Sequence, residues 1–591
     1  MVLAGPGSGK TSVIVERTAY MINEGGISPS NILVVTFSRA AAKEMKERFL
    51  SFTGQQYTSV TFGTFHGVFY GILKQAYGFT AANILSDEEK FGILRELTLN
   101  YGGDLAEEGD FPEEIAREIS VVKGNKIALE HYYSSCCPDE VFRQIYQGYR
   151  EACQSRRKLD FDDMILYCYE LFVQRKDILE AWQKKFQYIL VDEFQDINQL
   201  QYDIVRMLAK PQNNLFIVGD DDQSIYHFRG ARPEIMLNFT RDYPDAETVT
   251  LDVNYRCSGQ ILSAAMHVIG ENKKRFSKKL STPNQVGKAV QIREFQNPRE
   301  EYLAVVSELR ERMGNGERLE DTAILLRTNQ EAEGLVGALM ERQVPFNMKE
   351  KLPNLFQHWI CRNLLAYMHF AAGEKNRKYF LEFMNRPNRY ISRDALSLSS
   401  VVSFEELKEF YKDKDWMCDR ITTLETHLRV LKSLAPYAAI NFIRKGMGYE
   451  EYLREYAEYR KIKPEELSEI LDRLTESTKG MNSLEEWESY IEEYTEKLEE
   501  QARKAEQERE GVLISTLHGV KGLEYEQVYI LNVNEGSMPY RKAVLEPAIE
   551  EERRLFYVGM TRARKQLALC YVRQQYEKKR EPSRFLKEAG V

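Results

Sequence analysis

The first eleven residues contain a glycine-rich phosphate-binding loop, and this feature constrains the fold more than any other. The segment Ala4–Thr11 reads AGPGSGKT and follows the short apolar run of residues 1–3. Three glycines free the backbone N–H groups to surround a polyphosphate, Lys10 can reach the β- and γ-phosphates, and the Thr11 hydroxyl can bind Mg²⁺. Such a loop needs a strand before it and a helix after it. These residues are therefore predicted to belong to an α/β core that binds a nucleoside triphosphate.

Length and composition limit the classes of protein that fit this chain. At 591 residues it exceeds a single core, so three or four domains of about 100–200 residues are expected. Hydrophobic residues make up 43% and charged residues 29%, as in a soluble globular protein. No apolar run approaches the ~18–20 residues of a membrane span, and no signal peptide precedes the loop. The 8 cysteines form no C-x-x-C pair, so reduced thiols, a cytoplasmic location and no membrane partner are predicted.

Net charge alone argues against a nucleic-acid partner. The chain carries −9 at pH 7, whereas a bulk basic field supplies most non-specific nucleic-acid binding. An acidic chain can still hold a local basic groove, so such an interface has to be argued from particular residues.

Short apolar runs between loops predict buried parallel strands in two sets. The first set is residues 31–37, 188–191, 215–218 and 248–251; the second is 289–295, 322–327, 512–516, 528–533 and 567–572. Helical periodicity fills the stretches between them. The predicted architecture is two α/β cores, each interrupted by a helical insertion. The first core spans residues 1–80 and 182–258 around the insertion 81–181, and the second spans 259–373 and 509–591 around the insertion 374–508.

The charged run at the end of the second insertion, residues 485–510, permits two interpretations. A coiled coil would need a heptad that persists, and none does. A solvated amphipathic helix leading back into the second sheet is therefore favoured.

An apolar strand that ends in two carboxylates predicts the catalytic acids. Residues 188–191 are followed directly by Asp192 and Glu193. Acids at the carboxyl end of a parallel strand project into the crevice where ligands bind. Beside a phosphate loop, Asp192 is the expected Mg²⁺ ligand and Glu193 the candidate base that orients the attacking water.

A stretch that begins at Gln223 combines a nucleotide contact with a base-stacking pattern. Gln223 follows a predicted strand and a carboxylate cluster, so its amide could touch a γ-phosphate. Tyr226 and Phe228, with Arg229 beside them, suit single-stranded nucleic acid, because rings stack on bases while the cation meets phosphate. Two core aromatics remain the alternative on spacing alone.

Each half of the chain also presents an arginine that could reach a triphosphate. Arg256 follows a strand in the first half and Arg562 lies near a helix in the second. Two arginines converging on the phosphates would stabilise the charge of the transition state. The loop at 516–525 holds a histidine, a lysine and a glutamate, but H-x-x-K is not a metal-ligand spacing. A loop that links nucleotide to polymer is favoured there.

Together these stretches resemble superfamily 1 DNA helicases of the UvrD/Rep/PcrA type. The resemblance covers nearly the whole chain, in the family's motif order. The matching segments are the phosphate loop, 36–45 (TFSRAAAKEM), 61–66 (TFGTFH), 159–163 (LDFDD), 191–196 (VDEFQD), 223–229 (QSIYHFR), 254–256 (NYR), 516–524 (TLHGVKGLE) and 551–563 (EERRLFYVGMTRA). The resemblance implies two RecA-like parallel-sheet cores, ATP and Mg²⁺ as cofactors, and ATP-driven 3′-to-5′ movement on single-stranded DNA. It also implies unwinding of duplex at single-strand/double-strand junctions in repair, replication or recombination.

The resemblance further implies a role for each matching residue. The implied catalytic residues are Lys10, Asp192, Glu193, Gln223, Arg256 and Arg562. The implied ATP-binding residues are Gly5, Gly7, Ser8, Gly9, Lys10, Thr11 and Ser12, with Tyr255 stacking on the adenine and Glu524 near the ribose. Thr11 and Asp192 would hold Mg²⁺. The residues implied to face single-stranded DNA are Thr36, Phe37, Phe65, His66, Tyr226, Phe228, Arg229, Thr516 and His518.

Two departures from the family pattern modify these expectations. The family usually carries, upstream of the loop, a segment whose glutamine reads the adenine edge. Only three residues precede Ala4 here, so the sequence resembles an N-terminally truncated member, and relaxed nucleotide preference or poor folding is expected. Phe228 stands where many relatives have tryptophan, which reduces the area for stacking.

Other functions compatible with the same motifs stay open. A translocase could strip proteins from single strands without separating duplex. A catalytically impaired remnant that only holds ATP and DNA is a second alternative, against which the intact Lys10, Asp192, Glu193 and Arg562 argue. A recombination nuclease subunit would need a carboxylate-rich extension, and residues 571–591 are too short for one. Protein partners and oligomeric state are not predicted.

Overall fold

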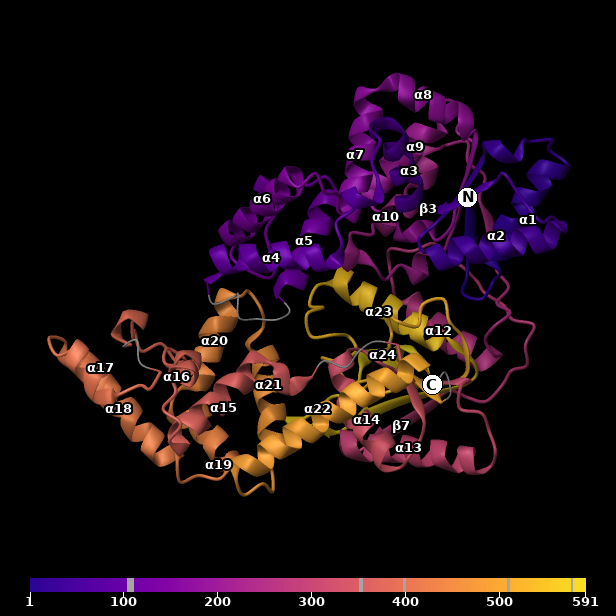
Figure 1. Ribbon diagram of the computed structural model, residues 1–591. Coiled ribbons are helices and arrows are strands. Elements are labelled where there is room, and N and C mark those ends of the chain that lie inside the picture. Colours follow the sequence, from indigo (N-terminus) through magenta and orange to yellow (C-terminus); the bar gives the residue numbers. More distant parts are fainter. Residues whose placement is uncertain (104–110, 350–353, 397–399, 508–510, 576–577, 591) are drawn as a thin grey trace.

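Two sheet-based bodies and a helical arm make up the molecule. The computed structural model describes residues 1–103, 111–349, 354–396, 400–507, 511–575 and 578–590. In Figure 1 the first body lies above the second, and the arm, drawn in orange, extends to the left. Each body holds a six-stranded sheet, and all of its pairings among the described residues are parallel. The predicted class, two RecA-like α/β cores with helical insertions, is confirmed.

The strands of the two sheets come from widely separated parts of the chain. The first sheet has the order β3-β2-β4-β5-β1-β6, with β1 Val2–Ala4, β2 Ile32–Thr36, β3 Thr61–Thr64, β4 Tyr188–Val191, β5 Leu215–Gly219 and β6 Val249–Leu251. The second has the order β7-β12-β11-β8-β10-β9, with β7 Gln291–Phe295, β8 Thr322–Leu326, β9 Phe346–Met348, β10 Val512–Thr516, β11 Tyr525–Ile530 and β12 Ala563–Val572. Central strands such as β2 and β8 are buried along their whole length, which suits a sheet covered on both faces.

The strand order of the first sheet brings three functional loops together. β5 pairs with β1 on one side and with β4 on the other, all parallel. The carboxyl ends of these three strands therefore meet at one edge of the sheet, where ligands bind in open α/β sheets. The segments that leave this edge are the glycine-rich loop after β1, Asp192-Glu193 after β4, and residues 220–223 after β5.

The helices in the first half of the chain form two groups. One group packs on the first sheet, and the other packs in a separate apolar cluster. The helices are α1 Lys10–Asn23, α2 Arg39–Thr53, α3 Phe65–Tyr77, α4 Asp87–Tyr101, α5 Phe111–Gly124, α6 Asp139–Ser155, α7 Phe161–Gln174, α8 Lys176–Lys185, α9 Gln199–Ala209, α10 Pro233–Leu237 and α11 Phe239–Asp242. α7 packs against α3 and α9, in the same apolar cluster as the first sheet. α4, α5 and α6 bury their apolar faces in a different cluster. The stretch 81–181 therefore divides between two cores.

The second half has the same plan. Its core helices are α12 Gly259–Gly270, α13 Pro298–Gly314, α14 Ala332–Glu341, α23 Glu546–Met560 and α24 Arg584–Glu588, and β13 Gln574–Gln575 pairs with β14 Lys578–Lys579. The arm contains α15 Trp359–Ala372, α16 Arg377–Phe383, α17 Phe404–Phe410, α18 Asp415–Leu431, α19 Pro436–Asn441, α20 Tyr449–Tyr459, α21 Pro464–Ser477 and α22 Leu484–Gln507. Residues 485–507 of the charged run lie in the single helix α22, and residues 508–510 lie outside the described residues. Tyr490 and Tyr494 of α22 pack edge-on against Phe356. This is the amphipathic helix that the periodicity favoured.

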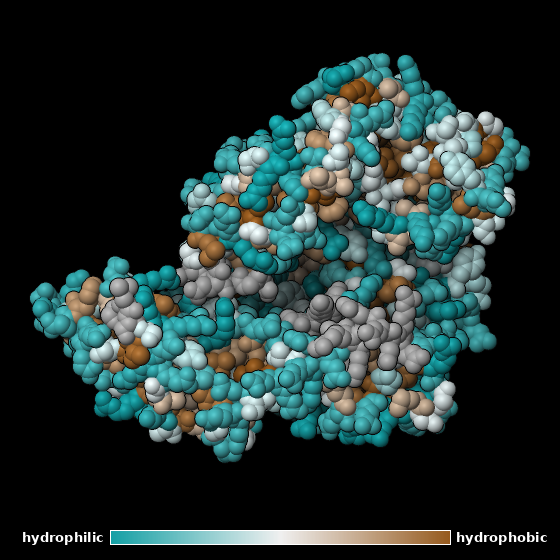
Figure 2. Space-filling model, in the orientation of Figure 1, coloured by the Kyte–Doolittle hydropathy of each residue, from teal (hydrophilic) through white to brown (hydrophobic). Residues whose placement is uncertain are grey.

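The two insertions touch each other through buried charge. Arg460 at the end of α20 donates to Glu114 of α5 at 2.6 Å and to the carbonyl of Cys136 at 2.9 Å. Their buried residues form one apolar cluster. Figure 2 shows a mainly hydrophilic face that is hollowed between the first body and the second. Within the described ranges, no helix has the length and apolarity that crossing a membrane requires.

A buried glutamate in the second core makes stability depend on pH. Glu301 of α13 is fully buried; one oxygen accepts from the N–H of Asn532 at 3.1 Å, and burial raises its pKa from 4.5 to about 8. The folded state thus keeps a proton that the unfolded state loses above pH 4.5, so this residue favours unfolding increasingly as pH rises to about 8.

We expect Glu301→Gln to remove that dependence. Relative to the variant, the wild-type free energy of unfolding should fall by about 1.4 kcal/mol per pH unit between these two pKa values. Urea denaturation at several pH values from 5 to 8 measures the difference. Parallel pH profiles for the two proteins would contradict the assignment.

Candidate functional site

The glycine-rich loop runs between β1 and the first turn of α1. Gly9 precedes α1 with a φ of 86°, a left-handed conformation that glycine adopts without strain. Gly7 also has a positive φ, and a Cβ built there would lie 2.7 Å from the Cβ of Arg256. Ser8 donates to the carbonyl of Gly5 at 2.8 Å, which closes the loop. The N–H groups and dipole at the start of α1 then favour a phosphate.

Asp192 and Glu193 follow β4 and approach Lys10. The Nζ of Lys10 lies 3.9 Å from one carboxylate oxygen of Glu193. Gln195 donates to the other oxygen at 2.5 Å. Glu193 has a φ of 50°, a left-handed conformation that is strained for a residue with a Cβ and is concentrated at functional sites.

The two acids differ in their affinity for a proton. Burial and the neighbouring Glu193 raise the pKa of Asp192 to about 7. Burial acts in the same direction on Glu193, but Lys10 and Lys521 outweigh it, so the pKa of Glu193 is lowered. Glu193 is therefore the acid that stays ionised at neutral pH, as a general base requires.

One oxygen of Asp192 suits a bound cation. Its Oδ1 is buried and has no hydrogen-bond partner among the described residues. A buried carboxylate oxygen is unfavourable unless a cation or water meets it. Thr11, the residue after Lys10 in the first turn of α1, supplies a hydroxyl at the end of the glycine-rich loop. Oxygens of these two kinds are the ligands that Mg²⁺ prefers, so the residues fit the ion.

Gln223 connects the first core to an arginine of the second. It ends the short turn after β5, and its Nε2 donates to Asp220 at 2.6 Å. Arg562 follows α23 and donates through Nη2 to the Oε1 of Gln223 at 3.2 Å. Burial, with Arg256 nearby, lowers the pKa of Arg562 to about 9, and its Nε donates to the carbonyl of Val558. The charges of Arg562 and Glu193 interact, so this buried cation is positioned to meet an anion in the space between the two cores, which we call the cleft.

The segment 254–256 lies directly on the glycine-rich loop. The side chain of Asn254 donates to the carbonyl of Pro6 at 2.7 Å, and the N–H of Tyr255 donates to the carbonyl of Gly7 at 3.0 Å. Tyr255 is 64% exposed, so its ring is accessible for stacking. Arg256 donates to Glu524 of the second core at 2.7 Å. A nucleotide that engages Arg256 would have to compete with this ion pair.

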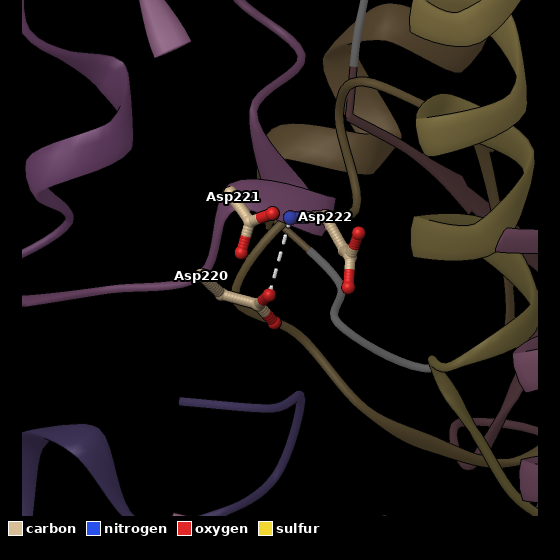
Figure 3. Close-up of side chains that lie close together, drawn as sticks. All are labelled: Asp220, Asp221 and Asp222. Atoms are coloured by element: carbon tan, nitrogen blue, oxygen red, sulfur yellow. Dashed lines mark hydrogen bonds between the residues drawn. The ribbon is translucent and has the colours of Figure 1, made fainter. Parts of the chain in front are cut away.

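Three consecutive aspartates after β5 form a dense carboxylate group, which we call the aspartate cluster (Asp220, Asp221 and Asp222). Figure 3 shows their side chains converging, with the N–H of Asp222 bonded to the carboxylate of Asp220. Oxygens this close could hold a metal ion. The Nζ of Lys278 already meets all three carboxylates, at 2.6, 2.7 and 2.9 Å, and Arg275 meets Asp222 at 2.7 Å. Two protein cations therefore already offset most of the negative charge of the cluster and occupy its oxygens, which argues against a metal there.

An aromatic surface lies beside this cleft and draws on both cores. Phe228 is 41% exposed, and its ring lies edge-on to Tyr226 and to His518, with centroids 6.0 and 5.3 Å apart. The guanidinium of Arg229 lies 5.5 Å from the Phe228 ring. Burial and the nearby Arg327 lower the pKa of His518 to about 3, so its ring is neutral. Lys521 lies 4.8 Å from the Tyr226 ring, bonds to Asp196 and donates to the carbonyl of Gln223 at 2.8 Å.

Comparison with known proteins identifies the family. The model described as UvrD/REP helicase N-terminal domain matches residues 1–244, and the one described as UvrD-like helicase C-terminal domain matches residues 249–574. The chain belongs to the UvrD-like helicase family. Similar proteins include YjcD of Bacillus subtilis, 34% identical over 99% of this chain and 78% of that protein. DNA helicase II of Escherichia coli is 32% identical over 100% of this chain and 85% of that protein, and ATP-dependent DNA helicase PcrA of Staphylococcus aureus is 30% identical over 100% and 84%.

The residues that the helicase resemblance assigned to single-stranded DNA fall into two groups in the structure. Phe37, His66, Tyr226, Phe228, Arg229 and His518 are wholly or partly exposed. Thr36, Phe65 and Thr516 are buried. Phe65 begins α3 and packs in the core, where its ring supports the exposed Phe37 edge-on at 5.6 Å. In this conformation Phe65 positions a surface ring instead of forming the surface, and direct contacts to DNA stay predictions.

Several residues of the UvrD-like site were not assigned from the sequence. Gln195 bonds both Glu193 and the N–H of Asp220, and so joins the ends of β4 and β5. Its place in the VDEFQD motif was the available signal. Lys521 stood inside the quoted loop of residues 516–524, whose role in linking nucleotide to polymer fits its contacts. Lys278 lies in none of the motifs, and no pattern pointed to it.

Proposed function

We propose that this chain is an ATP-dependent DNA helicase that moves 3′ to 5′ along single-stranded DNA and separates the duplex ahead of it. The names of its relatives, DNA helicase II and ATP-dependent DNA helicase PcrA, support this proposal. One observation carries it: Arg562 of the second core bonds to Gln223 of the first, in the cleft that holds Lys10 and Glu193. A nucleotide there would contact both cores, so its hydrolysis would alter how they meet.

Each residue of the cleft has a role that its position allows. Lys10 binds the β- and γ-phosphates of ATP, and Glu193 accepts a proton from the attacking water. Arg256 and Arg562 neutralise charge that develops on the transferring phosphoryl group. Thr11 and Asp192 would hold Mg²⁺, which offsets phosphate charge when bound. In this proposal Gln223 would contact the γ-phosphate, and its hydrogen bond to Arg562 would transmit the loss of that phosphate to the second core.

The aromatic surface supplies the DNA contact, and Lys521 couples it to the nucleotide. Phe228, Tyr226 and Arg229 combine rings for stacking with a cation for phosphate, which compensates locally for the acidic chain. Lys521 contacts the Tyr226 ring and donates to the carbonyl of Gln223. A shift of the second core would therefore alter the DNA-binding surface and the nucleotide site together.

Phe228→Ala is expected to weaken binding of a single-stranded oligonucleotide by about 1–3 kcal/mol, roughly 5–150-fold in Kd, because one base stack is lost. The KM for ATP should change little. Fluorescence anisotropy of a labelled oligonucleotide measures the effect. Tyr77→Ala, which removes an exposed ring at the end of α3, is the matched control. Equal losses in both variants would argue against a specific stacking site.

Strand displacement on tailed duplexes tests the proposal. Duplexes with a 3′ tail, a 5′ tail or blunt ends are compared with and without ATP. We expect displacement of the 3′-tailed duplex only, and only with ATP. Displacement from the 5′ tail would contradict the direction. Removal of a bound protein from single strands without displacement would instead identify the stripping translocase.

A further inference from the structure

We propose that Lys278 is a positioning residue for ATP hydrolysis: it fixes the carboxylate of Asp220, which in turn orients the side-chain amide of Gln223 toward Arg562. The inference rests on the proposed function, since it concerns the same cleft. Lys278 lies in the segment between α12 and β7, outside every motif recognised in the sequence.

The two oxygens of Asp220 have separate partners. Oδ1 accepts from the Nζ of Lys278 at 2.6 Å, and Oδ2 accepts from the Nε2 of Gln223 at 2.6 Å. All three side chains are buried. A carboxylate accepts only, so it selects the NH₂ end of the Gln223 amide and leaves the Oε1 end facing Arg562. The orientation of Gln223 thus follows from the charge and place of Asp220.

Lys278 is what allows Asp220 to stay ionised in this position. Burial acts to raise the pKa of Asp220, but Lys278, followed by Lys10, reverses the shift. Without Lys278, the aspartate cluster would hold three carboxylates against one cation, Arg275. Like charges so close and so buried would force protonation or movement of a carboxylate. A protonated Asp220 could donate as well as accept, and the amide of Gln223 would no longer be held in one orientation.

The segment that carries Lys278 is also bonded to the helix that precedes Arg562. Glu550 of α23 accepts from the N–H of Lys273 at 2.7 Å, and Arg554 of α23 donates to the carbonyl of Lys274 at 3.1 Å. Arg562 follows α23 and meets Gln223 directly. Displacement of α23 would therefore reach Gln223 from two directions, through Arg562 and through Lys278. Lys278 of the second core thus bonds to Asp220 of the first core, the residue that orients Gln223.

A double-mutant cycle between Lys278 and Gln223 tests the inference, because these side chains act through Asp220. Steady-state ATP hydrolysis with saturating single-stranded DNA is measured for Lys278→Met, Gln223→Ala and the double variant, normalised to folded protein. We expect each single variant to lower kcat by about 10–100-fold, as for other misplaced active-site groups, with KM for ATP little changed. The double variant should be no worse than the singles, because both act on one step.

Two further variants separate positioning from folding. Asp220→Asn leaves two carboxylates against two cations, so it relieves charge in the cluster, yet its amide cannot select one end of Gln223. It should fold and still lose kcat to the same extent. Arg275→Met is the matched control, since it removes the cluster's other cation, which bonds Asp222 and not Asp220. It leaves the same three carboxylates against one cation, but Lys278 still contacts Asp220, so its kcat should fall less than that of Lys278→Met.

The outcomes are distinct. Wild-type kcat in both Lys278→Met and Asp220→Asn, or losses in kcat that multiply in the double variant, would overturn the positioning role while leaving the helicase proposal intact. A loss of thermal stability with normal kcat per folded molecule would reduce Lys278 to a structural residue. Absence of ATP hydrolysis in the wild-type chain would instead contradict the proposed function itself.

Discussion

Arg562→Ala will lower DNA-stimulated ATP hydrolysis by about 10³–10⁵-fold, the contribution that an arginine of this kind makes in other phosphoryl-transfer enzymes. The guanidinium is buried and already positioned: it donates to the carbonyls of Val558 and Leu523 and to the amide of Gln223. These neutral partners leave its charge available for the phosphoryl group. Because the loss falls on the transition state, KM for ATP should change far less than kcat.

The control for this variant lies two residues further on. Arg564 is half-exposed and pairs with Glu524 and Glu526 at the surface. Surface pairs of this sort contribute little, about 0–1 kcal/mol, so Arg564→Ala should retain kcat. Steady-state kinetics with saturating single-stranded DNA compares the two. Similar kcat values for both variants would show that Arg562 of the second core does not contribute to ATP hydrolysis.

Lys10→Ala will lower ATP hydrolysis by about 10²–10³-fold or more, because it removes the cation aimed at the β- and γ-phosphates. It also removes the charge 3.9 Å from Glu193 that helps to keep this base ionised. Unlike Arg562→Ala, this change should weaken nucleotide binding as well as turnover. Titration with a fluorescent ATP analogue, alongside steady-state kinetics, separates the two effects.

Lys43→Ala serves as the matched control for Lys10. Lys43 lies on the exposed face of α2 and pairs only at 3.7 Å with Glu47 in the next turn, among the described residues. Its removal tests whether any loss of a lysine from the first core lowers activity. Retained nucleotide binding in Lys10→Ala would mean that the loop does not hold the triphosphate as described.

The buried strands were predictable, as were the edge strands β6 and β7, whereas the other two described edge strands, β3 and β9, were not. Short, nearly continuous apolar runs predicted the observed bounds of β4 and β10, because a strand covered on both faces needs apolar side chains on both of them. β3 (TFGT) and β9 (FNM) were missed because they are short and partly exposed. β3 and β9 adopt a strand conformation because they pair with β2 and β10. The local sequence does not specify these long-range pairings. Similarly, α7 reads as part of an insertion but packs on the first core, since helical periodicity does not specify which surface a helix covers.

The candidate site was predictable where its residues are adjacent in sequence. The loop around Lys10, the acids after β4 and the rings near Phe228 each form a local pattern that chemistry can interpret. The contacts that join these patterns are long-range: Lys278 meets Asp220 across 58 residues, and Arg562 meets Gln223 across 339. A lone lysine has no local signature, and its three carboxylate partners become visible only when the second half of the chain folds back onto the first.

The measurement that tests the central claim most directly is the rate of ATP hydrolysis by the wild-type chain with and without single-stranded DNA. If the two cores share one nucleotide and the aromatic surface is linked to it through Lys521, DNA must stimulate hydrolysis, and the stimulation must saturate as the strand binds. An identical rate at every DNA concentration, with binding of the strand verified independently, would contradict the coupling between nucleotide and DNA.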